Sequence, residues 1–223
     1  MIPPYRAVRL WDWPVRLAHW GFVLLLPMLW WTAEEGDMET HRRLGIAMLF
    51  LVLLRLIWGL VGSDPARFAR FVKGPGAVLA YLRGEQAPAP GHSPLGGWSV
   101  AALLSVLSIQ LGLGLLAQDE YGLVAGPLNH LVSYETAEMV TEWHESFFNV
   151  ILALVGLHLA AVAFYTVVRQ QGLIGPMLSG QKEVDDNTPQ PRMAAWYVAV
   201  LALVGAAALT GWIGAGAPPF GQS

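Results

Sequence analysis

The sequence contains no cysteine and few charged residues: only 13% of its 223 residues are Asp, Glu, Lys or Arg. Without cysteine the chain forms no disulfide, no thiolate metal site, no iron–sulfur cluster and no covalent c-type haem linkage. Soluble domains carry about 25% charged residues, so the low charge excludes an ordinary soluble protein. A P-loop and an internal repeat are also missing, which argues against an ATP-driven pump. Any metal must therefore be held by histidine, of which there are six.

Apolar residues make up 55% of the chain and gather in blocks long enough to cross a hydrocarbon core about 30 Å thick. We predict an all-α integral membrane protein with a bundle of four transmembrane helices in residues 1–180. A polar linker follows at 181–193, and a fifth helix with an outer tail at 194–223. One interfacial helix is expected between the second and third spans, and the first helix is expected to be retained rather than cleaved as a signal peptide. The predicted spans of the bundle are 14–32, 41–62, 95–117 and 138–168.

The basic residues predict the orientation of these spans. Arg42 and Arg43 flank the membrane on one side, and all the other loop cations lie on the opposite side. Because cytoplasmic loops are enriched in Lys and Arg, we predict a cytoplasmic N-terminus and an outer C-terminus. The cytoplasmic set is Arg6, Arg9, Arg67, Arg70, Lys73, Arg83, Arg169, Lys182 and Arg192.

Four histidines occupy two matched depths in this topology. His144 and His158 share one helix-length block, and fourteen steps turn a helix about 1400°, roughly 40° short of four turns, and advance it about 21 Å. Both rings therefore face the same way. His19 in the first span matches the depth of His158, and His41 at the start of the second matches that of His144. Each pair joins the fourth span to an N-terminal one.

Two imidazoles from facing helices are the axial ligands that a haem takes in an apolar pocket. Zinc usually takes three or four clustered ligands, which pairs about 21 Å apart do not supply. We therefore predict two haems, an inner one on His19 and His158 and an outer one on His41 and His144. Two axial imidazoles leave the iron no open position, so electron transfer is the chemistry to expect. For His41 or His144 alone, the alternative is an interfacial polar residue at a helix end, whereas histidines within hydrocarbon are more often functional.

Haem propionates need cations, and three arginines are candidates. Arg55 follows His41 by fourteen residues and so lies on the same stripe at the depth of the inner site. Arg16 precedes His19 by one turn, while Arg42 lies beside the outer site. The alternative for Arg55 is a structural arginine whose head reaches the interface.

At this point the sequence resembles the bacterial cytochrome b561 family, which includes the cytochrome b subunits of nickel–iron hydrogenases. The resemblance implies two b-type haems on His19, His41, His144 and His158, in a bacterial inner membrane. It also implies electron flow between a membrane quinone and a periplasmic partner. Ser93 stands where the family usually has Asn, and the fifth helix exceeds its four-helix pattern. The matching stretches are WDWPVRLAHW, HRRLGIAMLFLVLLRLIWGLVGSDPARFARF, PGHSPLGGW and WHESFFNVILALVGLHLA.

The loop before the third span carries the candidate quinone contacts. His92 and Ser93 lie there, near the inner haem on the predicted topology, and could hydrogen-bond a quinone headgroup. The alternative is that Ser93, which precedes Pro94, only caps the following helix.

The outer loops are acidic, with nine carboxylates against two arginines. A cationic partner suits such a face, either a basic c-type cytochrome or a hydrogenase or dehydrogenase subunit. The chain would then be an electron-transfer subunit, with or without quinone oxidoreductase activity of its own. Superoxide oxidation, which the resemblance also allows, ranks lower because an anionic substrate would favour a basic surface. A haem-free proton or ion transporter and a mere membrane anchor rank lower still. Membrane lipid is a further expected partner, and nucleic acid is not.

Overall fold

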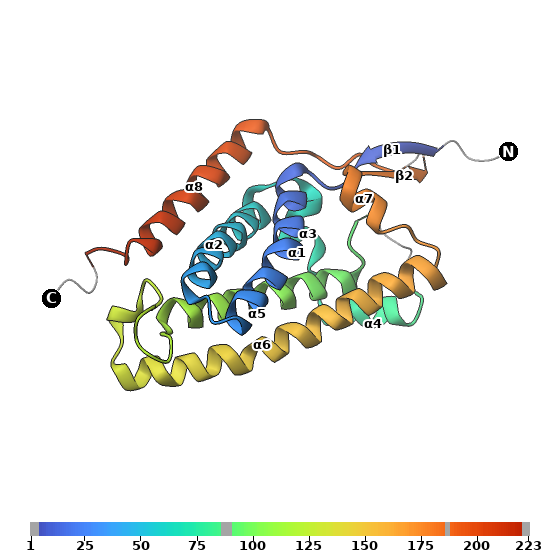
Figure 1. Ribbon diagram of the computed structural model, residues 1–223. Coiled ribbons are helices and arrows are strands. Elements are labelled where there is room, and N and C mark those ends of the chain that lie inside the picture. The colour runs from blue at the N-terminus through green and yellow to red at the C-terminus, as the bar shows by residue number, and fades with distance from the viewer. Residues whose placement is uncertain (1–4, 86–90, 186–187, 220–223) are drawn as a thin grey trace.

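The computed structural model describes residues 5–85, 91–185 and 188–219. Pro90 of the third matching stretch, two residues of the predicted linker and the last residues of the predicted outer tail lie outside the described residues. Five long helices form the body of the molecule (Figure 1). They are α1 (Trp13–Glu34), α2 (Met38–Val61), α5 (Pro94–Leu116), α6 (Tyr134–Ala163) and α8 (Trp196–Gly214).

The prediction of an all-α membrane protein is confirmed. Four described helices are long and apolar enough to cross a membrane: α2, α5, α8, and α6 with the π-helical turn η3 (Phe164–Val168) that continues it. Helix α1 has a similar length but is not among the four. Arg16, His19 and several tryptophans lower its hydropathy, so its place as a span remains a prediction.

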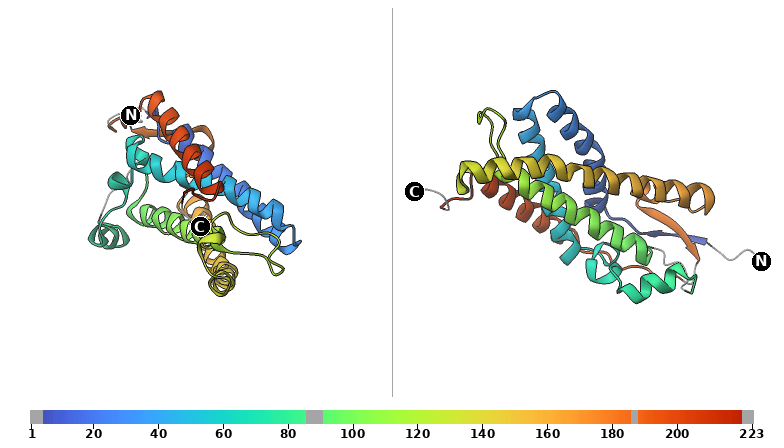
Figure 2. Two further views of the ribbon diagram at one scale, coloured as in Figure 1. Left: turned by 90° about the vertical axis from the view of Figure 1, so that its left-hand side faces the viewer. Right: turned by 90° about the horizontal axis from the view of Figure 1, so that it is seen from below.

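Helix α2 lies in the middle of the long helices. Helix α1 lies against α2, α5 lies against α6, and α8 covers the side of α2 remote from α6 (Figure 1, Figure 2). Ala199, Ala202 and Ala206 are buried in the contact of α8 with Leu54 and Trp58 of α2. Small side chains let two helices approach closely in a membrane, which explains this contact. A second apolar cluster lies between α1, α2, α5 and α6 around Val52, Leu107 and Ile151.

Short elements gather at one end of the bundle, which we call the inner end. The start of α1 and the start of α5 lie there, and the loop between α1 and α2 lies at the opposite, outer end (Figure 1). The sequence predicted one interfacial helix between α2 and α5, and the structure has three short helical elements there. These are η1 (Asp64–Ala66), α3 (Phe68–Phe71) and α4 (Pro75–Leu82), while η2 (Asn129–Leu131) and α7 (Ile174–Ser179) lie in later connections.

A two-stranded sheet joins the N-terminal segment to the linker after α6. Strand β1 (Tyr5–Arg9) pairs antiparallel with β2 (Gln181–Asp185), with Ala7 opposite Glu183. Next to it, the backbone N–H groups of Leu10 and Trp11 donate to the carbonyl of Gly180 at 2.8 and 3.1 Å. Strand β2 lies in the polar linker predicted at 181–193, and neither strand was predicted from the sequence. The sheet fixes the entry of α1 against the segment that follows α6.

Side-chain caps fix the starts of four long helices. Each cap accepts a hydrogen bond from a backbone N–H three residues further on, which satisfies one of the donors left open in a first turn. The four caps are Asp12 of α1, Asp37 of α2, Ser93 of α5 and Ser133 of α6.

Candidate functional site

The outer histidine pair comes together between α2 and α6. The ring centroids of His41 and His144 are 6.1 Å apart, with an angle of 85° between the ring planes. A metal-bound imidazole nitrogen lies about 2 Å from the metal, and the ring centre about 1 Å further, so imidazoles on opposite sides of one metal have centroids about 6 Å apart. The pair therefore has the spacing that axial ligation requires.

Each of these rings is anchored through its Nδ1 atom. Nδ1 of His41 lies 2.9 Å from the carbonyl oxygen of Leu29 on α1, and Nδ1 of His144 lies 3.0 Å from that of Gln110 on α5. A carbonyl accepts a hydrogen bond, so both Nδ1 atoms carry the proton in these contacts. Nε2 then keeps its lone pair for a metal. Metal-bound histidines are usually held in this way, by a partner on the second nitrogen.

Gly114 of α5 makes room for the ring of His144. A Cβ atom placed at Gly114 would lie 2.8 Å from Cε1 of His144, closer than such contacts normally occur. Gly45, one turn after His41 on α2, has nothing within 4 Å of the corresponding position. Open space beside the histidines is what a planar macrocycle needs. Neither the two carbonyl partners nor the contact between Gly114 and His144 follows from the sequence alone.

The inner pair is His19 on α1 and His158 on α6. Both rings are partly buried. Nδ1 of His19 is buried and has no hydrogen-bond partner among the described residues. A buried polar atom without a partner usually points to a missing ligand or water. Among described residues no three His, Asp or Glu side chains form a metal-binding group, so paired ligation remains the pattern to test for haem.

Arg55 is buried at the inner end with 5% of its surface exposed. Its Nη1 donates to the carbonyl of Ala66 at 3.3 Å, and its Cζ lies 5.1 Å from the ring centre of Phe68 and 5.9 Å from that of Phe71. Asp12, which accepts a hydrogen bond from Nε1 of Trp58 at 2.9 Å, is the nearby carboxylate. These contacts leave guanidinium N–H groups for a propionate, but they also support the structural reading.

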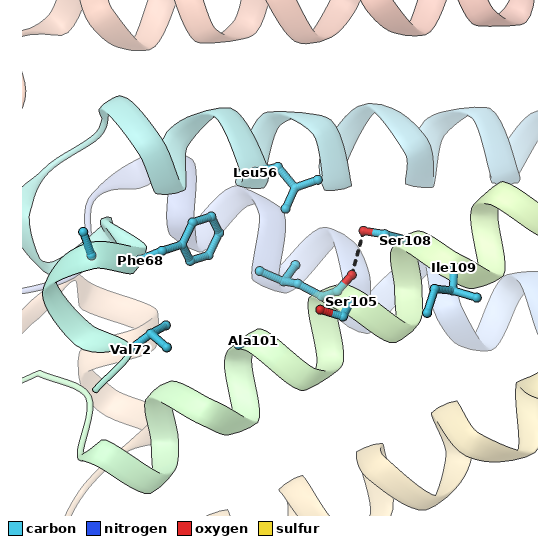
Figure 3. A pocket seen from close by; sticks show the side chains of 9 residues that line it. Leu56, Phe68, Val72, Ala101, Ser105, Ser108 and Ile109 are labelled. Atoms are coloured by element: carbon cyan, nitrogen blue, oxygen red, sulfur yellow. Dashed lines mark hydrogen bonds between the residues drawn. The ribbon is translucent and has the colours of Figure 1, made fainter. Parts of the chain in front are cut away.

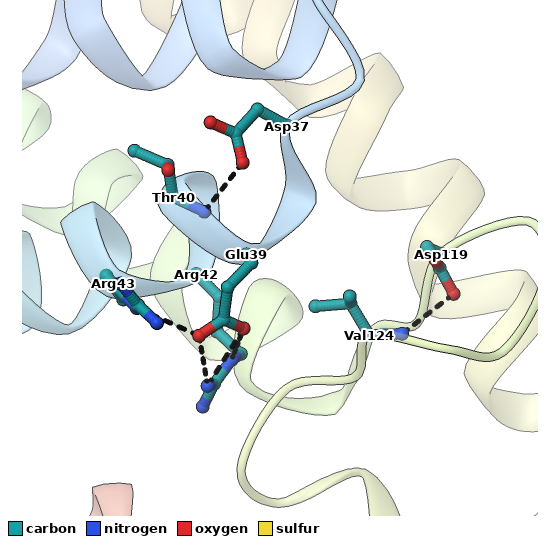
Figure 4. Close-up of polar contacts among 7 residues, drawn as sticks. All are labelled: Asp37, Glu39, Thr40, Arg42, Arg43, Asp119 and Val124. Atoms are coloured by element: carbon teal, nitrogen blue, oxygen red, sulfur yellow. Dashed lines mark hydrogen bonds and ion pairs between the residues drawn. The ribbon is translucent and has the colours of Figure 1, made fainter.

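The other two propionate candidates have protein partners as well. A guanidinium nitrogen of Arg16 donates to the carbonyl of Leu178, while its Nε is buried without a partner in the described chain. Arg42 and Arg43 both pair with Glu39 at the outer end, Arg42 through Nη2 at 3.0 Å (Figure 4). Of the three, Arg42 is the most fully neutralised.

The two quinone candidates of the sequence differ in their surroundings. Ser93 accepts a hydrogen bond from the N–H of Gly96 at 3.1 Å, as a helix cap does. His92 is enclosed by aromatic rings, with centroids 4.6 Å from that of Trp11 and 4.3 Å from that of Phe71. Its Nδ1 is buried and without a partner among the described residues.

The enclosure of His92 predicts an acid-sensitive fold. Burial, helped by the positive charge of Arg55, lowers the pKa of His92 to about 3. An unfolded chain has the ordinary histidine pKa of about 6.5, so it takes up a proton first as the pH falls. The stability that neutral His92 contributes is therefore present above pH 6.5 and lost progressively between about 6.5 and 3. Lowering the pH from 7 to 4.5 should reduce the free energy of unfolding of the unsubstituted protein. The reduction should be about 2 kcal/mol larger than the reduction in a His92→Phe variant.

Thermal unfolding in detergent at both pH values measures this difference. Carboxylates titrate in both proteins, so only the difference between them reports on His92. Equal losses in the two proteins would show that His92 is not held neutral by its surroundings.

An apolar hollow of about 690 Å³ lies between α2, α3 and α5 (Figure 3). Phe68 points into it from α3 and Leu56 from α2, and Ser105 and Ser108 border it on α5. Oγ of Ser108 donates to the carbonyl of Leu104 at 2.7 Å. The hollow is separate from both histidine pairs and was not foreseen from the sequence.

The outer end carries exposed carboxylates. Glu35 and Asp37 are exposed in the loop between α1 and α2, and Glu135, Glu138 and Glu142 are exposed on α6. Hydrogen bonds from the hydroxyl and N–H of Thr40 lower the pKa of Asp37, which keeps it ionised (Figure 4). Asp119 is turned inward to the N–H of Val124, and Glu39 is neutralised by its two arginines. The net acidic character of this end persists in the structure.

A family model described as prokaryotic cytochrome b561 matches residues 10–180 of the chain. The matched stretch contains both histidine pairs and all residues that line the hollow, and α8 lies outside it. No curated protein and no solved structure matches the chain.

Proposed function

The chain belongs to the prokaryotic cytochrome b561 family, and we propose from this that it holds two haems b and passes electrons between a membrane quinone and a partner at its outer end. Family membership makes the protein a membrane b-type cytochrome of electron transfer that binds haem b. Two haems, the quinone, the partner and the direction across the bacterial inner membrane are our proposal.

The observation that carries the proposal is the outer histidine pair. The ring centroids of His41 and His144 are 6.1 Å apart, a separation that would let the two rings hold one haem iron between them, and each ring has its Nδ1 atom anchored to a carbonyl of a neighbouring helix. These anchors would hold the rings in the orientation that ligation needs before any cofactor arrives. His19 and His158 would hold the second haem, with Arg55 and Arg16 as propionate partners and Arg42 in that role at the outer site.

A bound haem supplies one-electron changes between ferrous and ferric iron. Reduction of a quinone to a quinol takes up two electrons, from two such changes, and two protons, which water at the inner end would supply. The protein residues then hold the rings, exclude water from the bundle and neutralise the propionates. If two histidines hold each haem as proposed, the iron would have no open position, and substrates would react at the haem edges.

We propose that the inner end is cytoplasmic and the outer end periplasmic. Most Lys and Arg residues lie at the inner end, as the positive-inside rule requires. The pairing of β1 with β2 supports this proposal, because it requires the N-terminal segment and the linker after α6 to lie on one side.

The exposed carboxylates favour a cationic partner at the outer end, such as a basic c-type cytochrome or a basic patch on a hydrogenase or dehydrogenase subunit. Raising the salt concentration from 50 to 500 mM should weaken binding of a basic c-type cytochrome about tenfold or more, because salt screens exposed charges. A Glu138→Gln/Glu142→Gln variant should bind more weakly at low salt. Glu183→Gln, which removes a carboxylate from β2 at the inner end, is the matched control. Binding that ignores salt would exclude this kind of docking.

Superoxide oxidation coupled to quinone reduction is the second candidate. The family resemblance allows it, but an acidic outer end would repel the anion, which keeps it in second place. A haem-free transporter does not fit a member of this family.

Reoxidation of the reduced protein by a short-chain quinone tests the proposed activity. The dithionite-reduced protein should show a b-type alpha band that disappears when the quinone is added without excess reductant. A reduced spectrum that is unchanged by quinone would refute the quinone part while leaving haem binding intact.

A further inference from the structure

The hollow between α2, α3 and α5 is bordered by an exposed hydroxyl group that has no partner among the described residues. Ser105 borders it, and its hydroxyl makes no hydrogen bond with any described residue, whereas Ser108 one turn on donates to Leu104 (Figure 3). Serines on membrane helices usually bond to a carbonyl of their own helix, because an unpaired hydroxyl in hydrocarbon is costly. The Ser105 O–H is therefore a donor available to a ligand that reaches this face from the lipid.

The other residues that line the hollow indicate which kind of ligand it would bind. Phe68 offers an aromatic face, and Leu56, Val72 and Leu104 are apolar. The hollow is open at the surface, and its volume of about 690 Å³ leaves room for a small molecule. An apolar slot with one free donor and an aromatic wall fits a flat ring that carries carbonyl acceptors. A saturated acyl chain would leave the Ser105 hydroxyl unpaired.

The hollow also borders the part of the bundle that holds the inner histidine pair. Leu56 lines the hollow and packs in the apolar cluster of the four-helix interior, together with Phe22 and Val155. Phe22 lies one turn from His19, and Val155 one turn from His158. The hollow and the inner histidine pair therefore border the same apolar cluster. The guanidinium of Arg55 lies over the ring of Phe68, 5.1 Å from its centroid.

We propose that this hollow is the binding site of the quinone ring, with Ser105 donating a hydrogen bond to a quinone carbonyl and Phe68 covering one face. The inference rests on the proposed function and moves the quinone from the loop of His92 and Ser93 to the hollow between α2, α3 and α5. Oγ of Ser108, whose proton is used on Leu104, can accept a hydrogen bond from a quinol hydroxyl. The two serines together therefore suit both redox forms.

Two variants test the site in the full haem-loaded protein. Ala101→Trp fills the hollow from α5 and should raise the KM for a short-chain quinone at least tenfold. Ser105→Ala removes only the donor and should raise it about fivefold, the usual effect of one neutral hydrogen bond. Ala207→Trp, on the exposed face of α8, makes the same change far from the hollow and should leave the KM unaltered.

The measurement is the rate of haem reoxidation at increasing quinone concentration, with the haem-to-protein ratio and reduced spectrum as checks on folding. Unchanged KM values in both hollow variants would overturn the proposal and leave the hollow to a lipid chain. A His92→Ala variant with a raised KM beside unaffected hollow variants would also overturn it, in favour of the loop. Failure of the proposed function looks different, because the unsubstituted protein would then not be reoxidised by quinone at all.

Discussion

Replacement of His144 with alanine should reduce the haem content of the protein from two haems per chain to one. His144 is the outer ligand on α6, and its ring faces that of His41 at the distance of two axial imidazoles. Without it the outer haem would keep one protein ligand, and a haem of the b type has no covalent attachment to retain it. The inner pair lies about four helical turns away, so the second haem should stay with an unaltered spectrum. Haem extraction and protein quantification measure the ratio.

His158→Ala is the reciprocal experiment and should remove only the inner haem. His130→Ala is the control, because His130 lies in the connection before α6 and belongs to neither pair. Loss of both haems from His144→Ala, with the protein still folded, would mean that the pairs are not independent sites. Retention of both would remove His144 from the ligand set.

Replacement of Gly114 with valine should weaken haem binding at the outer site although no ligand is replaced. A Cβ at this position would lie 2.8 Å from Cε1 of His144 and 3.2 Å from its Nδ1. The ring must then turn, which breaks its hydrogen bond to the carbonyl of Gln110 and moves Nε2 away from the metal position. We expect at least a tenfold loss of outer haem affinity, the scale on which the partners of metal ligands act. Haem titration of the apoprotein measures it.

Gly112→Val is the matched control on the same helix, because nothing lies within 4 Å of a Cβ built there. Both variants add the same apolar group to α5, so effects on membrane insertion should cancel. Equal haem affinity in the two variants would show that the ring of His144 can move away from the added side chain and still bind the haem.

The long helices could be predicted from the sequence because their cause is local. An apolar block of about twenty residues must form a helix in a bilayer, since no water is there to satisfy its backbone groups. The caps followed equally local rules: Ser93 and Pro94 predicted the start of α5. Where the sequence analysis weighed Ser93 as a cap, that role is present in the structure.

The features that escaped prediction depend on distant residues. The sheet of β1 and β2 pairs strands far apart in the chain, and the Gln181–Asp185 segment has little β propensity of its own. Likewise, the carbonyls of Leu29 and Gln110 can be recognised as partners of His41 and His144 only once α1 and α5 are in place. Gly114 is one of 24 glycines in the chain, and only the fold assigns it to His144.

The arginines illustrate the limit of spacing arguments. Spacing placed Arg55 at the depth of the inner histidines, and the structure does bury it at the inner end. Its contacts with Ala66, Phe68 and Phe71 come from the segment after α2, whose fold the sequence did not reveal. Its role toward a propionate therefore stays a prediction, as do those of Arg16 and Arg42.

The central claim is that four histidines hold two haems in one bundle, one above the other. The most direct test is the haem-to-protein ratio of the purified chain, combined with the absorption spectrum after reduction by dithionite. We predict two non-covalently bound haems per chain and a b-type alpha band of six-coordinate iron. A preparation with a single haem per folded chain, or a reduced spectrum of five-coordinate iron, would contradict the account.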